Sequence, residues 1–148
     1  MDKTIIYVSA PEDRPDFRLF TTFLWCDEQD VDSDGNSDNP ASQDWTELYM
    51  TNRANHAESF DINPAQQEPL ILEVQGTPES LASRAAYFLA LETNGRISSS
   101  LQGPYREPAA LLPMLGQDFD VEAAMERVAT SRYALATTEN PYPWLEEG

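Results

Sequence analysis

Residues 77–95, with the sequence TPESLASRAAYFLALETNG, constrain the fold most, because they carry the signals of an amphipathic helix. Thr77 is a good N-cap, Pro78 suits the first helical position, and Gly95 suits the C-terminal stop. The apolar side chains at helical spacing form one stripe, which consists of Leu81, Ala85, Phe88 and Leu89. The apolar run PLILEVQ at residues 69–75 precedes this helix. We therefore expect a strand and a helix that pack together on one side of a sheet.

Other short segments predict further strands, because they are rich in β-branched and aromatic residues or alternate apolar with polar residues. These strands are expected at residues 4–9, 17–26, 45–52 and 58–63, with a short further strand at 96–100. Together with residues 69–75 they predict a mainly antiparallel sheet of about five strands. The polar segment 63–69, which is bounded by prolines, is interpreted as a turn.

Residues 120–140 predict the second helix, with Asp118 or Asp120 as its cap. The inward stripe of this helix is expected to consist of Val121, Met125, Val128 and Leu135. Arg132 falls on the same stripe, so it either extends past the edge of the stripe or pairs with a carboxylate. The complete pattern predicts an α+β fold, with residues 1–148 in a single domain and two principal helices packed on one face of the sheet.

The C-terminal tail, residues 140–148, cannot continue the second helix, because Pro141 and Pro143 interrupt it. Its aromatic residues Tyr142 and Trp144 have two interpretations. They either anchor a partner, as exposed aromatic residues do in protein interfaces, or fold back and cover the domain.

The segment DEQDVDSDGNSD, residues 27–38, is the centre of a strongly acidic region. No basic residue occurs between Arg18 and Arg53, whereas the acids in this interval are Asp27, Glu28, Asp30, Asp32, Asp34, Asp38, Asp44 and Glu47. We interpret residues 27–44 as a long acidic hairpin loop with its turn at Asp34 and Gly35. Trp25 and Trp45 flank this loop, and a cross-strand pair between them is one possible arrangement.

The charge of the whole chain limits its possible partners. The chain contains 26 acidic residues against nine basic ones, which gives a net charge of -17. Such a field repels phosphate backbones and anionic lipids, so binding to nucleic acid or to a membrane is not expected. A basic protein would be attracted and steered towards the chain, and we predict that the eight acids between Asp27 and Glu47 form its binding surface.

The sequence also indicates a cytoplasmic protein. Cys26 is the only cysteine, so the chain cannot form an intramolecular disulfide, which fits a reducing compartment. The N-terminal apolar run is too short for a secretory signal, and no segment has the length and apolarity of a membrane span.

A calcium site is an alternative reading of the acidic segment. Asp30, Asp32 and Asp34 occupy positions one, three and five of an EF-hand loop, and Asp38 occupies position nine. Position twelve, which requires a bidentate glutamate, is Ala41, and the flanking segments are expected to be strands rather than helices. We therefore predict no metal ligand, and calcium binding through residues 30–38 stays as the alternative.

The sequence contains no recognisable catalytic constellation. His56 is the only histidine and has no nucleophile in a known motif near it. A thiolate at Cys26 would be disfavoured by the carboxylates of Asp27 and Glu28. No phosphate-binding loop and no zinc ligand set occur, so we predict a non-enzyme without a cofactor. An enzyme that uses His56 or a pair of carboxylates is the remaining catalytic hypothesis.

In its size, its acidic segment DEQDVDSDGNSD and its α+β layout, the chain resembles the small immunity proteins that neutralise bacterial polymorphic or interbacterial toxins. The resemblance is one of format and transfers no individual site residue. It implies a basic toxin as the partner, often a nuclease, whose cationic site is blocked by carboxylates. A nucleic-acid mimic that inhibits a DNA-binding protein ranks lower, because about half of the acids lie outside residues 27–47, interspersed with arginines.

Overall fold

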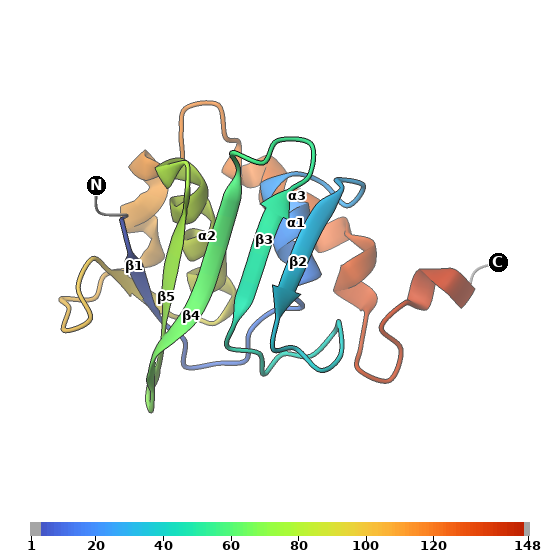
Figure 1. The fold of residues 1–148 in the computed structure, drawn as a ribbon, viewed down its shortest axis with the longest axis horizontal. Coiled ribbons are helices and arrows are strands. Elements are labelled where there is room, and N and C mark those ends of the chain that lie inside the picture. Colours follow the sequence, from blue (N-terminus) through green and yellow to red (C-terminus); the bar gives the residue numbers. More distant parts are fainter. Residues whose placement is uncertain (1–3, 147–148) are drawn as a thin grey trace.

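The chain forms one antiparallel sheet with its helices on one side, and the computed structural model describes residues 4–146 (Figure 1). The strands are β1 (Ile6–Ser9), β2 (Val31–Gly35), β3 (Leu48–Asn52), β4 (Ser59–Gln67), β5 (Leu70–Thr77) and β6 (Arg96–Ser98). Their order in the sheet is β2-β3-β4-β5-β1-β6, and every neighbouring pair is antiparallel. The predicted α+β class is confirmed, with a sheet of six strands.

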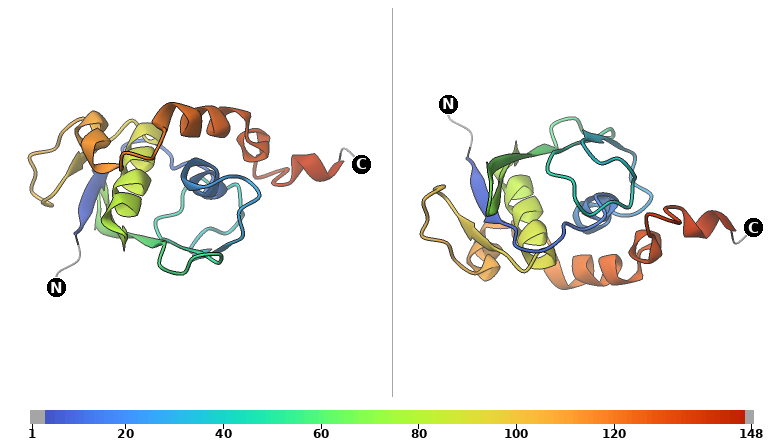
Figure 2. Two further views of the ribbon diagram at one scale, coloured as in Figure 1. Left: turned by 90° about the horizontal axis from the view of Figure 1, so that it is seen from above. Right: turned by 90° about the horizontal axis from the view of Figure 1, so that it is seen from below.

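The helices gather behind the sheet and leave its other face uncovered (Figure 2). They are α1 (Arg18–Leu24), α2 (Glu79–Glu92) and α3 (Val121–Thr130), with the 3-10 helices η1 (Pro108–Met114), η2 (Arg132–Leu135) and η3 (Pro143–Glu146). None of the helices described is long and apolar enough to cross a membrane. Met1–Lys3 at the start and Glu147–Gly148 of the predicted tail lie outside the described residues.

The segment predicted as a strand at residues 17–26 is helix α1, and this corrects the sequence prediction. Every residue of α1 from Leu19 to Leu24 is buried, including Thr21 and Thr22, so the helix is buried on all sides and has no amphipathic period. A continuous apolar run of this length fits a buried helix as well as a buried strand. Asp16 marks the helix start, because its Oδ1 accepts the backbone N–H of Arg18 at 2.9 Å.

Helix α2 confirms the helix predicted from residues 77–95 and forms the centre of the packing. It contacts β5, β1 and β4 on one side and η1 and α1 on the other. Pro78, rather than Thr77, is the N-cap residue, and Thr77 is the last residue of β5. Gly95 allows the chain to approach β1 closely, because a Cβ there would lie 1.8 Å from the carbonyl oxygen of Ser9.

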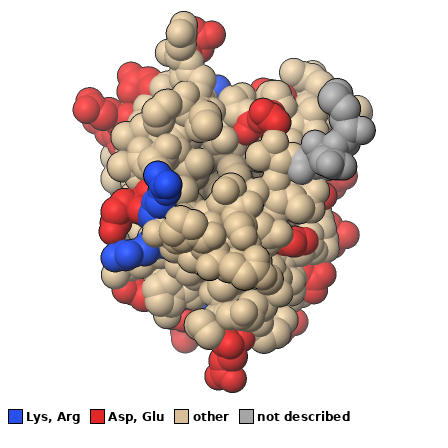
Figure 3. All heavy atoms as spheres, turned by 90° about the vertical axis from the view of Figure 1, so that its left-hand side faces the viewer, with Lys and Arg blue, Asp and Glu red and all other residues tan. Residues whose placement is uncertain are grey.

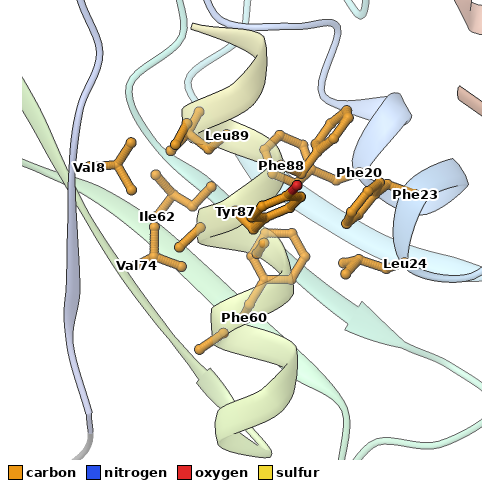
Figure 4. Close-up of a cluster of buried hydrophobic side chains, with 14 of the residues drawn as sticks. Val8, Phe20, Phe23, Leu24, Phe60, Ile62, Val74, Tyr87, Phe88 and Leu89 are labelled. Atoms are coloured by element: carbon orange, nitrogen blue, oxygen red, sulfur yellow. The ribbon is translucent and has the colours of Figure 1, made fainter. Parts of the chain in front are cut away.

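An aromatic cluster fills the space between α1, α2 and the sheet (Figure 4). The ring of Phe20 lies 5.0 Å from Phe88 of α2, 5.5 Å from Phe60 of β4 and 5.9 Å from Trp45, measured between ring centroids. Phe23 stacks on Phe88 at 4.7 Å. These separations are typical of favourable aromatic pairs, so α1 is held by its phenylalanines.

The acidic segment contains a strand, which corrects the predicted hairpin loop at residues 27–44. Strand β2 occupies its centre and pairs with β3 in a continuous register, from Val31 opposite Asn52 to Gly35 opposite Leu48. Gly35 ends the strand and forms no turn, since it pairs with Leu48. Its backbone lies close to β3, because a Cβ there would lie 2.2 Å from the carbonyl oxygen of Glu47. Because β2 is an edge strand with exposed residues, it lacks the apolar alternation that identifies a half-buried strand.

Trp25 and Trp45 do not meet across a hairpin, because residues 17–26 are helical. Trp45 is 1% exposed, and its Nε1 donates to the carbonyl oxygen of Pro15 at 2.8 Å. Trp25 follows α1, and its Nε1 donates to Glu58 Oε1 at 3.2 Å. Both indoles therefore belong to the body of the protein.

Strand β4 is longer than expected and continues through most of the predicted turn at residues 63–69. Its pairing with β5 shifts register between Pro64 and Gln66, so a local irregularity accommodates the proline. The short strand expected at residues 96–100 is present as β6. The connection between β4 and β5 is consequently a tight one at Glu68 and Pro69.

Helix α3 confirms the second predicted helix, although it ends at Thr130. Asp120 is its cap, because Asp120 Oδ1 accepts the N–H of Ala123 at 3.0 Å. Ser131 has extended backbone angles and starts η2, so Leu135 leaves the predicted stripe and is 79% exposed. Arg132 pairs with carboxylates, which confirms one of its two predicted roles: its Nη2 lies 3.3 Å from Glu28 Oε1.

The tail folds back on the domain through Trp144, in agreement with one of its two interpretations. The Trp144 ring lies 5.3 Å from the ring of Tyr133 and 5.5 Å from the guanidinium carbon of Arg18. Tyr133 and Tyr142 lie at 4.8 and 5.3 Å from the same guanidinium carbon. Cation–π contacts with Arg18 therefore attach the tail to the start of α1.

The aromatic cluster gives the first testable prediction. Substitution Phe20→Ala removes a fully buried ring and leaves a cavity between α1, α2 and the sheet, so we expect the free energy of unfolding to fall by about 3–5 kcal/mol. Leu135→Ala, at an exposed position, is the control and should change it by less than about 0.5 kcal/mol. Urea unfolding followed by circular dichroism measures both, and similar losses would contradict the packing described for α1.

Candidate functional site

The uncovered face of the sheet is lined by polar and acidic side chains. Leu48 and Met50 of β3 are buried beneath the helices, so Tyr49 and Thr51 point to the opposite face. Residues paired across neighbouring strands share a face, which places the acids of β2, β4 and β5 beside Tyr49. We define the acidic sheet face by these carboxylates: Asp32, Asp34, Glu47, Asp61 and Glu73.

Basic residues are missing from the strands that form this face. The sequences of β2, β3, β4 and β5 contain no lysine or arginine. Asp34, Tyr49, Asp61 and Gln75 form one row across the four strands, and Asn63 and Glu73 belong to the next row. Adjacent strands lie about 4.8 Å apart, so these side chains form one continuous negatively charged surface on a rigid support.

Tyr49 lies at the centre of the acidic sheet face. Its hydroxyl oxygen is 2.7 Å from Asn63 Oδ1 and 3.1 Å from Glu47 Oε1, and it donates its single hydrogen between these two acceptors. Partial desolvation, the hydrogen bond to Glu47 and the charges of Glu47, Asp61 and Asp34 raise the pKa of the Tyr49 phenol. The neutral phenol therefore acts as a hydrogen-bond donor among carboxylates.

At the β2 edge, Arg53 partly balances the acidic charge. Its guanidinium nitrogens lie 3.2 Å from Asp30 Oδ1 and 3.7 Å from Asp32 Oδ1. The side chains are 55%, 69% and 70% exposed for Arg53, Asp30 and Asp32, so water screens these pairs and they add little stability. Within the part of the chain that the structure describes, Asp34 has no such basic partner.

Asp27 has an internal role, which differs from the docking role predicted for it. Its carboxylate accepts hydrogen bonds from the hydroxyls of Thr22 and Ser131 and from the backbone N–H of Arg132 at 3.2 Å. Its side chain is only 16% exposed. Asp27 therefore links the end of α1 to the start of η2, and its oxygen atoms are already occupied.

The other predicted acids are spread over separate places. Glu28 is exposed and pairs with Arg132, whereas Asp38 and Asp44 are exposed in the connection between β2 and β3. Glu47 precedes β3 and joins the acidic sheet face through Tyr49. The structure thus brings together Asp32, Asp34 and Glu47, with Asp30 beside them at the strand edge.

The three aspartates of the possible calcium loop do not surround a common point. Asp30 precedes β2, and Asp32 and Asp34 belong to it, so side chains two residues apart are separated by roughly 7 Å along the strand. An EF-hand loop instead folds its ligands around one ion. Among residues 4–146, no group of three or more histidine, cysteine or acidic side chains is placed to hold a metal.

A second group of acidic residues lines a cavity beside the start of α1. The cavity has a volume of about 490 Å³ and lies between the start of α1, the end of α2 and residues 133–139. Its ionisable lining residues are Asp13, Asp16, Glu92, Tyr133 and Glu139. Asp16 is neutralised by Arg18 at 2.6 Å, and burial raises the pKa of the Glu92 carboxyl.

Tyr49, Asp61 and Glu73 were not among the predicted site residues, although the sequence contains a signal for them. In residues 60–62 and 72–74, Asp61 and Glu73 alternate with buried apolar residues. This period of two places each acid on the face opposite the core. The order of the strands, which places Asp61 and Glu73 beside Tyr49 and Asp34, was not evident from the sequence.

The acidic sheet face gives a prediction for the ionisation of Tyr49. Its phenol should ionise above the ordinary pKa of 10.0, and Asp61→Asn should lower this pKa because it removes a neighbouring negative charge. NMR titration of the tyrosine Cζ carbons measures it, with Tyr49→Phe to assign the signal. Glu126→Gln, on the exposed side of α3, is the matched control. An unchanged pKa in Asp61→Asn would contradict the arrangement around Tyr49.

Glu92 gives a prediction for stability. Burial raises its pKa above the ordinary value of 4.5, so its charged form lowers the free energy of unfolding at neutral pH. Glu92→Gln should therefore stabilise the protein at about pH 7, and the gain should vanish as the pH falls below the pKa of the unfolded chain. Urea unfolding across this pH range measures the effect. A gain that persists at low pH would show that charge burial is not its cause.

No family model, curated protein or solved structure matches the chain. The function is therefore inferred from the geometry and the charge of the acidic sheet face.

Proposed function

We propose that this chain is a non-catalytic, cytoplasmic binding protein of the immunity type, which neutralises a basic protein toxin by covering its cationic surface. The observation that carries the proposal is the acidic sheet face, which is free of helices and free of basic residues in the strands that form it. A toxin that acts on nucleic acid, such as a nuclease, fits best, because its cationic site normally binds phosphates.

The electrostatics support this proposal. The net charge of -17 attracts a cationic protein from a distance and repels nucleic acid. The acidic sheet face then provides carboxylates at fixed positions, since cross-strand pairing holds them in rows. Binding of this kind gains specificity and association rate from charge complementarity.

The open shape of the acidic sheet face also supports a binding protein rather than an enzyme. The carboxylates and Tyr49 lie on an open surface, and the cavity of about 490 Å³ lies elsewhere, beside the start of α1 and the end of α2. His56 lies in the exposed turn between β3 and β4, outside the rows of the acidic sheet face. An open, charged surface suits a second protein better than a small substrate.

The test uses the basic protein encoded by a neighbouring gene, purified and mixed with this chain. We predict a complex whose association rate falls as salt rises, and whose formation inhibits the toxic activity. The triple variant Asp34→Asn, Asp61→Asn, Glu73→Gln should lower the association rate at low salt by about tenfold or more. Stopped-flow fluorescence measures the rate.

A matched control removes the same charge from the helical side. The triple variant Asp118→Asn, Glu122→Gln, Glu126→Gln changes exposed acids in and just before α3. It should bind almost as fast as the unaltered chain. Equal losses in both triple variants would mean that net charge alone attracts the partner, and the absence of any complex with basic proteins would contradict the proposed function.

A further inference from the structure

Strand β2 has an unpaired outer edge. It is the first strand of the sheet, and only β3 pairs with it. Arg53 N donates to Asp30 O at 3.0 Å, and Asn36 N donates to Glu47 O at 3.2 Å. Since hydrogen-bonded pairs alternate along an antiparallel ladder, the backbone N–H and C=O groups of Val31 and Ser33 point away from β3.

The opposite edge of the sheet is protected, in contrast to β2. Strand β6 has three residues, and Arg106 covers it through two backbone hydrogen bonds with Ile97, at 2.9 and 2.7 Å. Acidic groups surround this side of the molecule, and its few basic groups lie next to acidic ones (Figure 3). Strand β2 carries no lysine, proline or bulge, which commonly protect an edge.

The two sides of the β2 edge would meet different side chains of an added strand. On the uncovered face lie the carboxylates of Asp32 and Asp34. On the helical side lies a hollow of about 200 Å³, and Phe17, Trp45 and Leu48 supply its apolar lining. Ser33 and Gly35 of β2 also line it, together with Asp34 and Glu47. Alternate residues of an added strand would therefore face the carboxylates of the uncovered face and a partly apolar hollow in turn.

We propose that the free edge of β2 binds an extended segment of the basic partner as an added antiparallel strand, in which basic residues alternate with apolar ones. This inference rests on the proposed function and names the element by which the partner is held. The backbone groups of Val31 and Ser33 supply the hydrogen bonds, and Asp32 and Asp34 select the occupant by charge. A second copy of β2 is excluded by the same charges, because its aspartates would lie beside these.

The test uses a synthetic peptide of about seven residues that alternates arginine with valine. If valine faces the hollow, then the valine N–H groups pair with Val31 and Ser33, whereas the arginine N–H groups point outwards. N-methylation of the valines should therefore weaken binding by about tenfold or more, because it removes the shared hydrogen bonds. N-methylation of the arginines preserves the charge and these bonds, and it should leave the affinity nearly unchanged.

Substitutions in β2 test the same backbone hydrogen bonds by changing the protein instead of the peptide. Ser33→Pro removes one outward N–H, and an edge strand tolerates proline at such a position, so the fold should persist. We expect about threefold to tenfold weaker peptide binding, whereas Ser33→Ala should bind normally. Fluorescence anisotropy measures the affinities. Hydrogen exchange of the Val31 and Ser33 amides should slow when the unmodified peptide binds.

The outcomes separate this inference from the proposed function. Equal binding of the three peptides, with no effect of Ser33→Pro, would overturn strand addition and leave recognition by charge intact. Failure of all the peptides to bind at low salt would also overturn the inference. The proposed function would then be decided separately, by the salt-dependent binding of the folded basic protein.

Discussion

Burial of α1 between α2 and the sheet is the packing on which the other features depend. The phenylalanines of α1 contact β4 and α2, so this short helix closes the core on one side of the sheet. Because α1 is buried on all sides, it is also covered on its outer side, and α3 provides this cover. Arg127 of α3 donates to the carbonyl oxygens of Thr22 and Phe23 at 3.1 and 2.9 Å, which satisfies acceptors near the end of α1.

This packing explains why the other face of the sheet is polar. The helices gather on one side, so the strands β2 to β5 keep one face in contact with water, and that face carries polar residues. Its carboxylates come from different strands and repel each other, and Arg53, which lies 3.7 Å from Asp32 at the β2 edge, balances them only in part. A cationic partner of the kind proposed above would remove this repulsion.

The sequence predicted those elements whose residues follow a clear period. Helix α2 and the strands around Tyr49 and Asp61 were expected from helical or alternating patterns, and the strand around Glu73 was expected from a continuous apolar run. Of the two caps expected for α3, Asp118 and Asp120, the structure has Asp120. Helix α1 was not, because an element buried on all sides has no period. Strand β2 was not expected either. It is exposed along almost its whole length, so its sequence has no alternation of buried and exposed residues.

The candidate site was predictable only in part. The concentration of acids near Asp34 was evident from the sequence, but its spatial neighbours Asp61 and Glu73 are distant along the chain. The internal role of Asp27 depends on Ser131 and Arg132, which only the folded chain brings beside it. Sequence spacing alone therefore could not separate the carboxylates that face solvent from the one that holds the fold together.

The most direct test is NMR chemical-shift mapping of this chain with the proposed basic partner. We expect the largest changes at backbone amides of β2, β3 and β4, around Asp34, Tyr49 and Asp61, and little change in α3. Changes confined to α3, or to the cavity beside Glu92, would contradict the proposal.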